Sequence, residues 1–324
     1  MRKRNWLRHC AALAACSLIA PPLLASDTAC ALPTKLVVGF AAGGGVDALA
    51  RATAIPMGQS LRCTVVVDNR PGAGGAVAAS LVAAAPADGS TLLFGDTALL
   101  VGQHAVKTAR YNVQTQFMPL ARIAQVPLVL AVHNSVPVRT PQEFLALVKA
   151  SPGKYSYGSA GVGTLHHLSG ELLQQSAQLD WVHVAYKGGA PAVQDLVGGQ
   201  IPFAIASIPA VLPHARAGRV RLIAVMSDKR ATVLPDVPAM AETLAGFDAT
   251  PSIFLLAPRK VSAEQTARLE SATLQALSSP ELQAVLSAQG ATASPLGSAA
   301  LKDWLAREDA RWAQVVTKAG ISLD

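Results

Sequence analysis

The chain has 324 residues, of which 51% are hydrophobic and 15% are charged. This length allows two domains of ordinary size, and the apolar content is enough for a buried core, which excludes a disordered chain. The formal net charge of +7 is modest, only 5% of the residues are aromatic, and no basic run is interleaved with aromatic side chains, so the sequence does not indicate a nucleic-acid-binding protein.

The N-terminus has the pattern of a secretory signal peptide. Four basic residues precede an apolar stretch over residues 11–25, which is the order of a positive region followed by a hydrophobic region in such signals. The stretch is shorter than the roughly 20 residues that span a bilayer, and a Pro-Pro pair interrupts it, which argues against a membrane anchor. We expect cleavage after Ala31, with cleavage after Ala25 as the alternative. Removing residues 1–31 lowers the formal net charge from +7 to +4.

Cleavage would leave one or two of the four cysteines. Cys63 remains in either case, whereas Cys30 remains only when cleavage follows Ala25. Because Cys30 precedes the first predicted strand and Cys63 opens the second, the two could form a disulfide in an oxidising compartment.

The first part of the chain alternates between predicted strands and helices. Three short apolar runs predict strands, at residues 35–40, 64–67 and 91–94. The runs between them predict helices, at residues 47–61 and 76–85, the first disturbed at Pro56. This alternation predicts a parallel sheet with helices on both faces.

The same alternation recurs further along the chain. Strands are predicted at residues 126–133, 155–159, 181–186, 202–207 and 220–227, with an extended segment at 252–257. Helices are predicted at residues 141–150, 165–176, 191–197, 262–277, 280–289 and 298–319, and a loop at 228–238. No linker rich in Ser or Pro separates the two halves, so we expect a pair of crossing strands rather than a flexible tether.

Two glycine-rich turns each stand between a predicted strand and a predicted helix. One has the sequence AAGGGVD, at residues 41–47, and the other has the sequence GSAGVGT, at residues 158–164. Such a turn points free backbone N–H groups and the positive end of a helix dipole at one spot, which suits an anion. Two of these turns, far apart in the chain, predict two half-sites that face each other.

These turns and several other motifs resemble the Bug family, the periplasmic substrate-binding proteins of tripartite tricarboxylate transporters. The motifs stand in order at residues 36–40, 43–51, 65–75, 157–164, 167–172, 186–192, 195–200 and 234–238. The resemblance implies an α/β fold of the type II periplasmic binding protein class, also called a Venus flytrap. In this fold two domains, each a mainly parallel sheet flanked by helices, close over a ligand.

On this resemblance the chain divides into four parts. Residues 1–31 are the signal peptide, 32–125 the first part of domain 1, 126–227 domain 2, and 228–324 a return to domain 1 with the C-terminal helices. The resemblance implies a periplasmic protein that captures a small carboxylate-bearing metabolite for the membrane components of a transporter or for a sensor. We expect a monomer that has no catalytic residues, metal, cofactor or nucleic-acid partner.

In the family, carboxylates are held largely by backbone amides and ordered water from the two turns. The ligand-binding residues that the turns imply are Gly43, Gly44, Gly45, Val46, Asp47, Ser159, Gly161, Val162, Gly163 and Thr164. Thr97 and Ala98 follow the third predicted strand at the same sheet edge, where ligands bind, and Ser207 and Pro209 hold the matching position in the other domain. Some of these have structural alternatives: Asp47 can accept from the N–H groups of its own turn, and Ser159 and Thr164 can bond locally or cap a helix.

Other motifs are expected to be structural. The turn at residues 69–75 carries glycines that allow tight packing of strand against helix. His166 and His167 are neighbours on a predicted helix and point in different directions, which does not favour a shared metal ion.

This chain departs from the family in the first turn. Ala41 and Ala42 stand where prolines are common, and Val46 stands where a threonine is common, so the ligand stays open among amino acids, di- and tricarboxylates and aromatic acids.

The main alternative is an NAD-dependent oxidoreductase. Residues 43–48 fit the G-x-G-x-x-A fingerprint after a strand, and Asp68 ends the next strand. Export from the cytoplasm and the motifs in the rest of the chain argue against it. A hydrolase is weaker still, because residues 157–161 read YGSAG and lack the G-x-S-x-G elbow.

Overall fold

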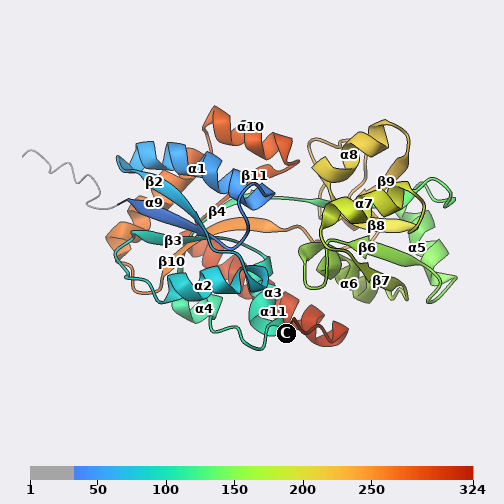
Figure 1. The fold of residues 1–324 in the computed structure, drawn as a ribbon, viewed down its shortest axis with the longest axis horizontal. Coiled ribbons are helices and arrows are strands. Elements are labelled where there is room, and N and C mark those ends of the chain that lie inside the picture. The colour runs from blue at the N-terminus through green and yellow to red at the C-terminus, as the bar shows by residue number, and fades with distance from the viewer. Residues whose placement is uncertain (1–32, 324) are drawn as a thin grey trace, which may run out of the picture.

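The computed structural model describes residues 33–323. The predicted signal peptide and Cys30 lie outside this range. Two β-sheets, each with helices on both faces, form two units that lie side by side (Figure 1). No helix in the described range is long and apolar enough to cross a membrane.

Within residues 33–323, six strands build the first sheet, in the spatial order β11-β4-β10-β3-β1-β2. They are β1 (Thr34–Val38), β2 (Val65–Asn69), β3 (Thr91–Asp96), β4 (Phe117–Gln125), β10 (Ser252–Pro258) and β11 (Thr292–Gly297). One face packs on α1 (Gly45–Leu61), α9 (Ala263–Ala276) and α10 (Pro280–Ala288). The other packs on α2 (Ala76–Ala83), α3 (Ala98–Ala105), α4 (Val113–Gln116) and α11 (Ser298–Ala319). With both faces covered, the central strands are nearly continuous apolar runs.

In the same range, five strands build the second sheet, in the order β7-β6-β8-β5-β9. They are β5 (Leu128–His133), β6 (Ser156–Ser159), β7 (Val182–Ala185), β8 (Phe203–Ser207) and β9 (Val220–Val225). One face packs on α5 (Pro141–Lys149) and α6 (Leu165–Ala177), the other on α7 (Gly189–Val197) and α8 (Ile208–Arg216). Short 3₁₀ turns, η1 (Ala73–Gly75) and η2 (Met240–Glu242), complete the regular structure.

The parallel strands that the sequence predicts lie together at one side of each sheet. β1 pairs in parallel with β2 and β3, and β6 pairs in parallel with β7 and β8. β10 and β5 run antiparallel to their neighbours. These two are the strands that the chain enters directly after passing from one unit to the other, so each sheet is mixed rather than fully parallel.

The chain passes between the units along two adjacent segments. The Val126 N–H donates to the Pro251 carbonyl across them, at 2.8 Å. The segment after β9 still packs in the second unit, because Met240, Phe247 and Ala249 belong to the core around β5 and β8. We therefore propose that the return crossing lies at about residues 250–251, later than residue 228, where the sequence predicts it.

The predicted elements are found, with some exceptions. The sequence does not predict β4, β11, α3, α4 or α8. Both missed strands contain a proline, and both prolines lie at irregularities of the strand pairing, at Pro119 and Pro295. The expected disturbance of α1 at Pro56 is wrong: the helix runs without interruption to Leu61, because Met57 and Leu61 beyond the proline are buried in the core.

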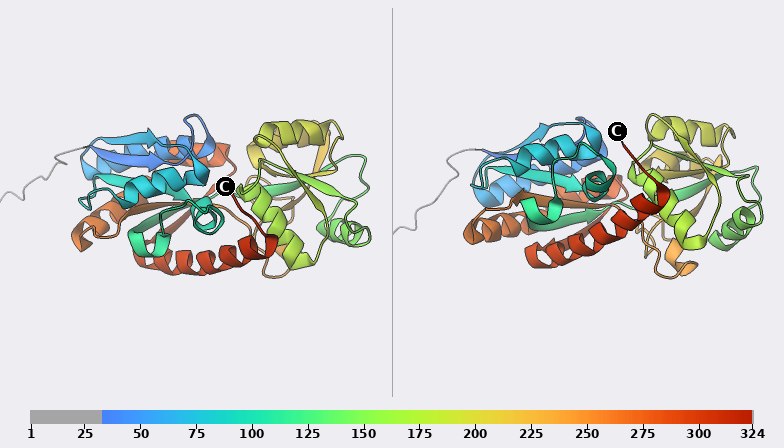
Figure 2. Two further views of the ribbon diagram at one scale, coloured as in Figure 1. Left: turned by 60° about the horizontal axis from the view of Figure 1, so that its bottom comes forward. Right: turned by 90° about the horizontal axis from the view of Figure 1, so that it is seen from below.

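The C-terminal helix α11 links the two units. It packs on the first sheet, and the Gln175 side chain of α6 donates to its Val315 carbonyl at 3.1 Å. Figure 2 shows the helix running along the first unit until its end reaches the second, with the tail after it turning back into the space between them. The tail is held there because the Leu323 N–H donates to the Ala105 carbonyl at 2.9 Å.

Candidate functional site

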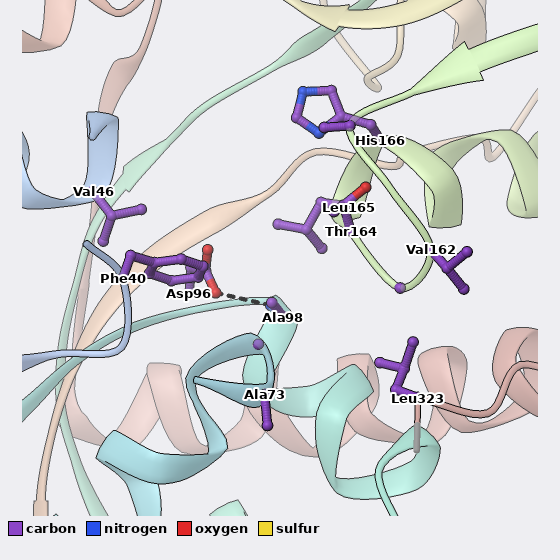
Figure 3. A pocket seen from close by; sticks show the side chains of 13 residues that line it. Phe40, Val46, Ala73, Asp96, Ala98, Val162, Thr164, Leu165, His166 and Leu323 are labelled. Carbon is purple, nitrogen blue, oxygen red and sulfur yellow. Dashed lines mark hydrogen bonds between the residues drawn. The ribbon is translucent and has the colours of Figure 1, made fainter. Parts of the chain in front are cut away.

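A cavity of about 500 Å³ lies between the two units (Figure 3). From the first unit it is lined by Phe40, Val46, Ala73, Gly74, Asp96, Ala98 and Leu323, and from the second by Ala160, Val162, Gly163, Thr164, Leu165 and His166. The two glycine turns that the sequence singles out therefore meet at one cavity, from opposite sides.

The first turn is shaped by one side chain, Asp47. Gly43 has φ of +85°, which glycine adopts without strain, and its N–H donates to the Asp47 carboxylate at 2.9 Å. Arg51 and Asn69 donate to the same carboxylate, each at 2.9 Å. Hydrogen bonds from Arg51, Gly43 and Asn69 lower the pKa of Asp47 to about 2 against the effect of burial. Asp47 thus holds its own turn, and it does not line the cavity.

The start of α1 leaves backbone donors unused. Gly44 is the N-cap residue and has no side chain to bond the first N–H groups of the helix. The first four N–H groups of a helix have no partner within it, and those of Gly44, Gly45 and Val46 donate no hydrogen bond within the described residues. Of these three residues, Val46 lines the cavity.

The second turn uses most of its own amides. The Gly161 N–H donates to the Ser159 hydroxyl at 3.1 Å, the Gly163 N–H to the His167 ring at 3.1 Å, and the Thr164 N–H to the Gly161 carbonyl at 3.2 Å. These three N–H groups are occupied in this conformation, whereas the sequence assigns them to the ligand. The Thr164 hydroxyl accepts from the His167 N–H and so caps α6. The N–H groups of the first two residues of α6, Leu165 and His166, have no partner within the helix.

A buried network supports the second turn from behind. The Ser159 hydroxyl lies 2.6 Å from Nε2 of His183, whose ring stacks on that of His167 at 3.9 Å. His167 lies 3.5 Å from the Glu171 carboxylate, which also accepts from the Tyr157 hydroxyl at 3.0 Å. This network accounts for Ser159 and His167 as parts of the scaffold.

The adjacent histidines face different ways, as the sequence predicts. His166 lines the cavity while His167 bonds to Gly163. Burial lowers the pKa of His166 to about 4, so its ring is neutral at physiological pH. Within residues 33–323 no group of three or more side chains is arranged to hold a metal ion.

At the end of β3, the residues that line the cavity differ from those that the sequence predicts. Thr97 is fully buried, and its hydroxyl accepts from the Ser252 N–H at 2.9 Å, which ties β3 to β10 away from the cavity. Its neighbours Asp96 and Ala98 line the cavity instead. The Ala98 N–H donates to one Asp96 oxygen at 3.0 Å, and burial raises the pKa of Asp96 to about 7.

Of the residues assigned from the sequence, Val46, Ala98, Val162, Gly163 and Thr164 line the cavity. Gly43, Gly44, Gly45 and Gly161 shape its two turns. Ser207 and Pro209 begin α8 and are not part of its lining. The turn at residues 69–75 packs tightly, since a Cβ on Gly39 would lie 2.5 Å from Cα of Gly75, but its Ala73 and Gly74 also line the cavity.

Sequence reasoning missed several lining residues. Phe40 follows β1 and Asp96 ends β3, where the carboxyl ends of these parallel strands meet, and that position could have indicated them. Leu165 and His166 follow the second turn directly. Leu323 had no signal in the sequence, because only the packing of the tail brings it to Gly163.

The electrostatics of the cavity come from the backbone. Three helices of the described chain, α1, α3 and α6, begin at its edge, and each places the positive end of its dipole there. No Lys or Arg of the described range lines it, and most lining side chains are apolar. Asp68, which an NAD site would need, lies outside the lining and pairs with Arg70 at 3.0 Å.

Comparisons with known proteins agree with this geometry. A sequence profile described as "Tripartite tricarboxylate transporter family receptor" matches residues 49–321. BugT of Bordetella pertussis is 35% identical over 308 residues, which cover 94% of each chain. A TctC solute-binding protein from Polaromonas, solved without ligand, has a TM-score of 0.80 at 26% identity, covering 89% of this chain and 99% of its own. R. palustris Rpa4515, solved with adipate, has a TM-score of 0.75 at 32% identity, covering 90% and 98%.

Proposed function

Because the chain belongs to the tripartite tricarboxylate transporter receptor family, as its motifs predict, we propose that it captures a small carboxylate-bearing metabolite in the cavity between its two domains. Members of this family are periplasmic substrate-binding receptors. Within this proposal residues 1–31 direct export and are removed, the mature protein is a periplasmic monomer, and it carries out no catalysis.

One observation carries the proposal: the N-termini of α1, α3 and α6 converge on a cavity that no Lys or Arg of the described chain lines. Unused N–H groups and helix dipoles attract an anion without a basic side chain. The adipate held by the R. palustris relative supports a carboxylate as that anion.

The proposed contacts follow from which donors are unused. One carboxylate oxygen would accept from the N–H groups of Gly44, Gly45 or Val46, and another from those of Leu165 or His166. Gly161, Gly163 and Thr164 would shape the second turn, since their N–H groups have partners within it. A carboxylate held from both sides favours the conformation in which the two domains are close together.

The closed surface is the form that partner proteins would recognise. We assign this role to the membrane components of a tripartite tricarboxylate transporter, with a sensor protein as the alternative. Neither partner is a nucleic acid.

A matched pair of variants tests the location of the site. Val46 is the second residue of α1 and lines the cavity, whereas Val77 is the second residue of α2 and is exposed. A new carboxylate at either position is favourable for its own helix, so both variants should fold. We expect Val46→Asp to lower affinity for carboxylates by about 100-fold or more, because its charge occupies the anion site and repels the ligand.

The measurement is isothermal titration of the mature protein with a panel of carboxylic acids, after a thermal-shift screen has chosen the acids that bind. Val77→Asp should bind like the wild type, and NAD should give no heat. Equal affinity in Val46→Asp and Val77→Asp would show that the acid binds elsewhere.

A further inference from the structure

Asp96 is the acidic side chain that lines the cavity, and it is an unexpected group in a site for anions. It is only 5% exposed and lies at the end of β3, where the Ala98 N–H donates to one of its oxygens at 3.0 Å. No hydrogen bond from residues 33–323 reaches its second oxygen, which in Figure 3 points away from Ala98.

The neighbouring acid behaves in the opposite way. Both oxygens of Asp47 are bonded, to Gly43, Arg51 and Asn69. Its charge is therefore used within the first turn, whereas one oxygen of Asp96 is left to face the cavity. A buried carboxyl with an unused oxygen is costly unless a ligand supplies its partner.

The rest of the lining limits what that partner can be. The side chains of Phe40, Leu165 and Leu323 are apolar, and they suit the body of a ligand rather than a charged end. His166 is half-buried, and its lowered pKa of about 4 keeps the ring neutral, so it does not balance the charge of Asp96.

We propose that Asp96 selects the ligand by the group that it carries opposite its anchored carboxylate, favouring a hydrogen-bond donor such as an ammonium or hydroxyl group over a second carboxylate. This inference rests on the proposed function, because the first carboxylate must be bound by the helix N-termini. The ligand class is then a small acid with an apolar body and a donor at its far end.

The physical reason is the difference between placing an ammonium group and placing a carboxylate next to Asp96. An ammonium group near the second oxygen of Asp96 forms a charge-assisted hydrogen bond in a cavity of low polarity. A carboxylate in the same place repels the ionised Asp96, and binds only if Asp96 takes up a proton. The raised pKa of Asp96, about 7, makes that proton available near neutral pH and scarce above it.

The test uses three matched series of probes of about four to six carbons, a size that a cavity of this volume admits. They are linear monocarboxylates, linear dicarboxylates and ω-amino acids, titrated calorimetrically at about pH 8, where Asp96 is ionised. We expect the best ω-amino acid to bind about tenfold or more tightly than the best dicarboxylate.

Asp96→Asn is the deciding variant. The asparagine oxygen can still accept from Ala98, so the local fold is kept, while the charge is gone. The preference for ω-amino acids should fall by about tenfold or reverse. Asp68→Asn, which removes a partly exposed carboxylate outside the cavity, should leave the preference unchanged.

A second measurement needs no variant. The affinity of the wild type for dicarboxylates should weaken from about pH 6 to about pH 8, while that for monocarboxylates stays level. The other titratable groups near Asp96 do not change charge in this range: the pKa of His166 is lowered to about 4, and that of Tyr111 is raised above its ordinary value.

The outcomes distinguish a wrong role for Asp96 from a wrong proposed function. If monocarboxylates and dicarboxylates bind the wild type but Asp96→Asn leaves the preference among the series unchanged, the role of Asp96 is wrong and the proposed function stands. If no acid of any series binds, the proposed function fails and the role of Asp96 fails with it.

Discussion

Asp47 and Asp96 lie near the same edge of the first sheet, and their surroundings set their protonation in opposite directions. Asp47 accepts from three donors, which lower its pKa to about 2. Asp96 accepts from one backbone N–H inside the protein, and burial raises its pKa to about 7. Residue type alone does not distinguish them, because the difference comes from the number of donors that the fold brings to each carboxylate.

The raised pKa of Asp96 gives a prediction for stability. An unfolded aspartate ionises near its ordinary pKa of 3.8, whereas the folded one holds its proton until about pH 7. The contribution of Asp96 to the free energy of unfolding is therefore greatest below its unfolded pKa and falls as the pH rises towards its folded pKa. Relative to the wild type, Asp96→Asn should be more stable at about pH 8 than at about pH 5 by on the order of 1–3 kcal/mol.

Thermal unfolding of both proteins at the two pH values measures this difference. Asp68→Asn serves as the control, since its carboxylate is partly exposed and pairs with Arg70 on the surface. A difference between wild type and Asp96→Asn that does not change with pH would mean that Asp96 is ionised throughout.

At the scale of elements, the sequence predicts most strands and helices, and prolines account for both missed strands. The glycine turns, the apolar strands and the amphipathic helices have local sequence patterns that indicate them without knowledge of their tertiary contacts. β4 and β11 were missed because Pro119 and Pro295 usually exclude a strand, and the bulges that accommodate them depend on β10 and β4 as partners. Pro56 predicts a disturbance of α1 that the structure does not show, because packing of α1 on the core outweighs the hydrogen bond that the proline removes.

The candidate site was predictable to a similar degree. The two turns and their meeting at one cavity follow from strand–turn–helix patterns. Which amides remain unused does not follow, because Ser159 and His167 occupy the amides of Gly161 and Gly163 only after β6, β7 and α6 have packed.

The C-terminal tail is the element whose role the sequence hides. Leu323 lines the cavity and packs so closely on Gly163 that a Cβ on Gly163 would lie 2.4 Å from the Leu323 side chain. We expect Leu323→Ala to weaken binding of acids with an apolar body by about five- to tenfold, because methylene groups of the wall are lost.

Titration of the two variants Leu323→Ala and Ser322→Ala with the tightest-binding acid checks the role of the tail. Ser322 is exposed and does not line the cavity, so its variant should match the wild type. Unchanged affinity in Leu323→Ala would mean that the tail lies beside the ligand without contacting it.

For the whole molecule, the two crossing segments and α11 set how the domains can move. The segments at Val126 and Pro251 are bonded to each other, and α11 packs on both units. The domains are thus joined by these segments and by α11, with the cavity between them, and paired crossing segments beside such a cavity can act as the hinge for closure around a ligand.

The central claim is that a small acid is held between the N-termini of α1 and α6. A crystal structure of the mature protein with the tightest-binding acid tests it most directly. We predict that the carboxylate oxygens accept from backbone N–H groups of Gly44, Gly45 or Val46 on one side and of Leu165 or His166 on the other. An acid bound outside this cavity, or held there by Lys or Arg side chains in place of these N–H groups, would contradict the account.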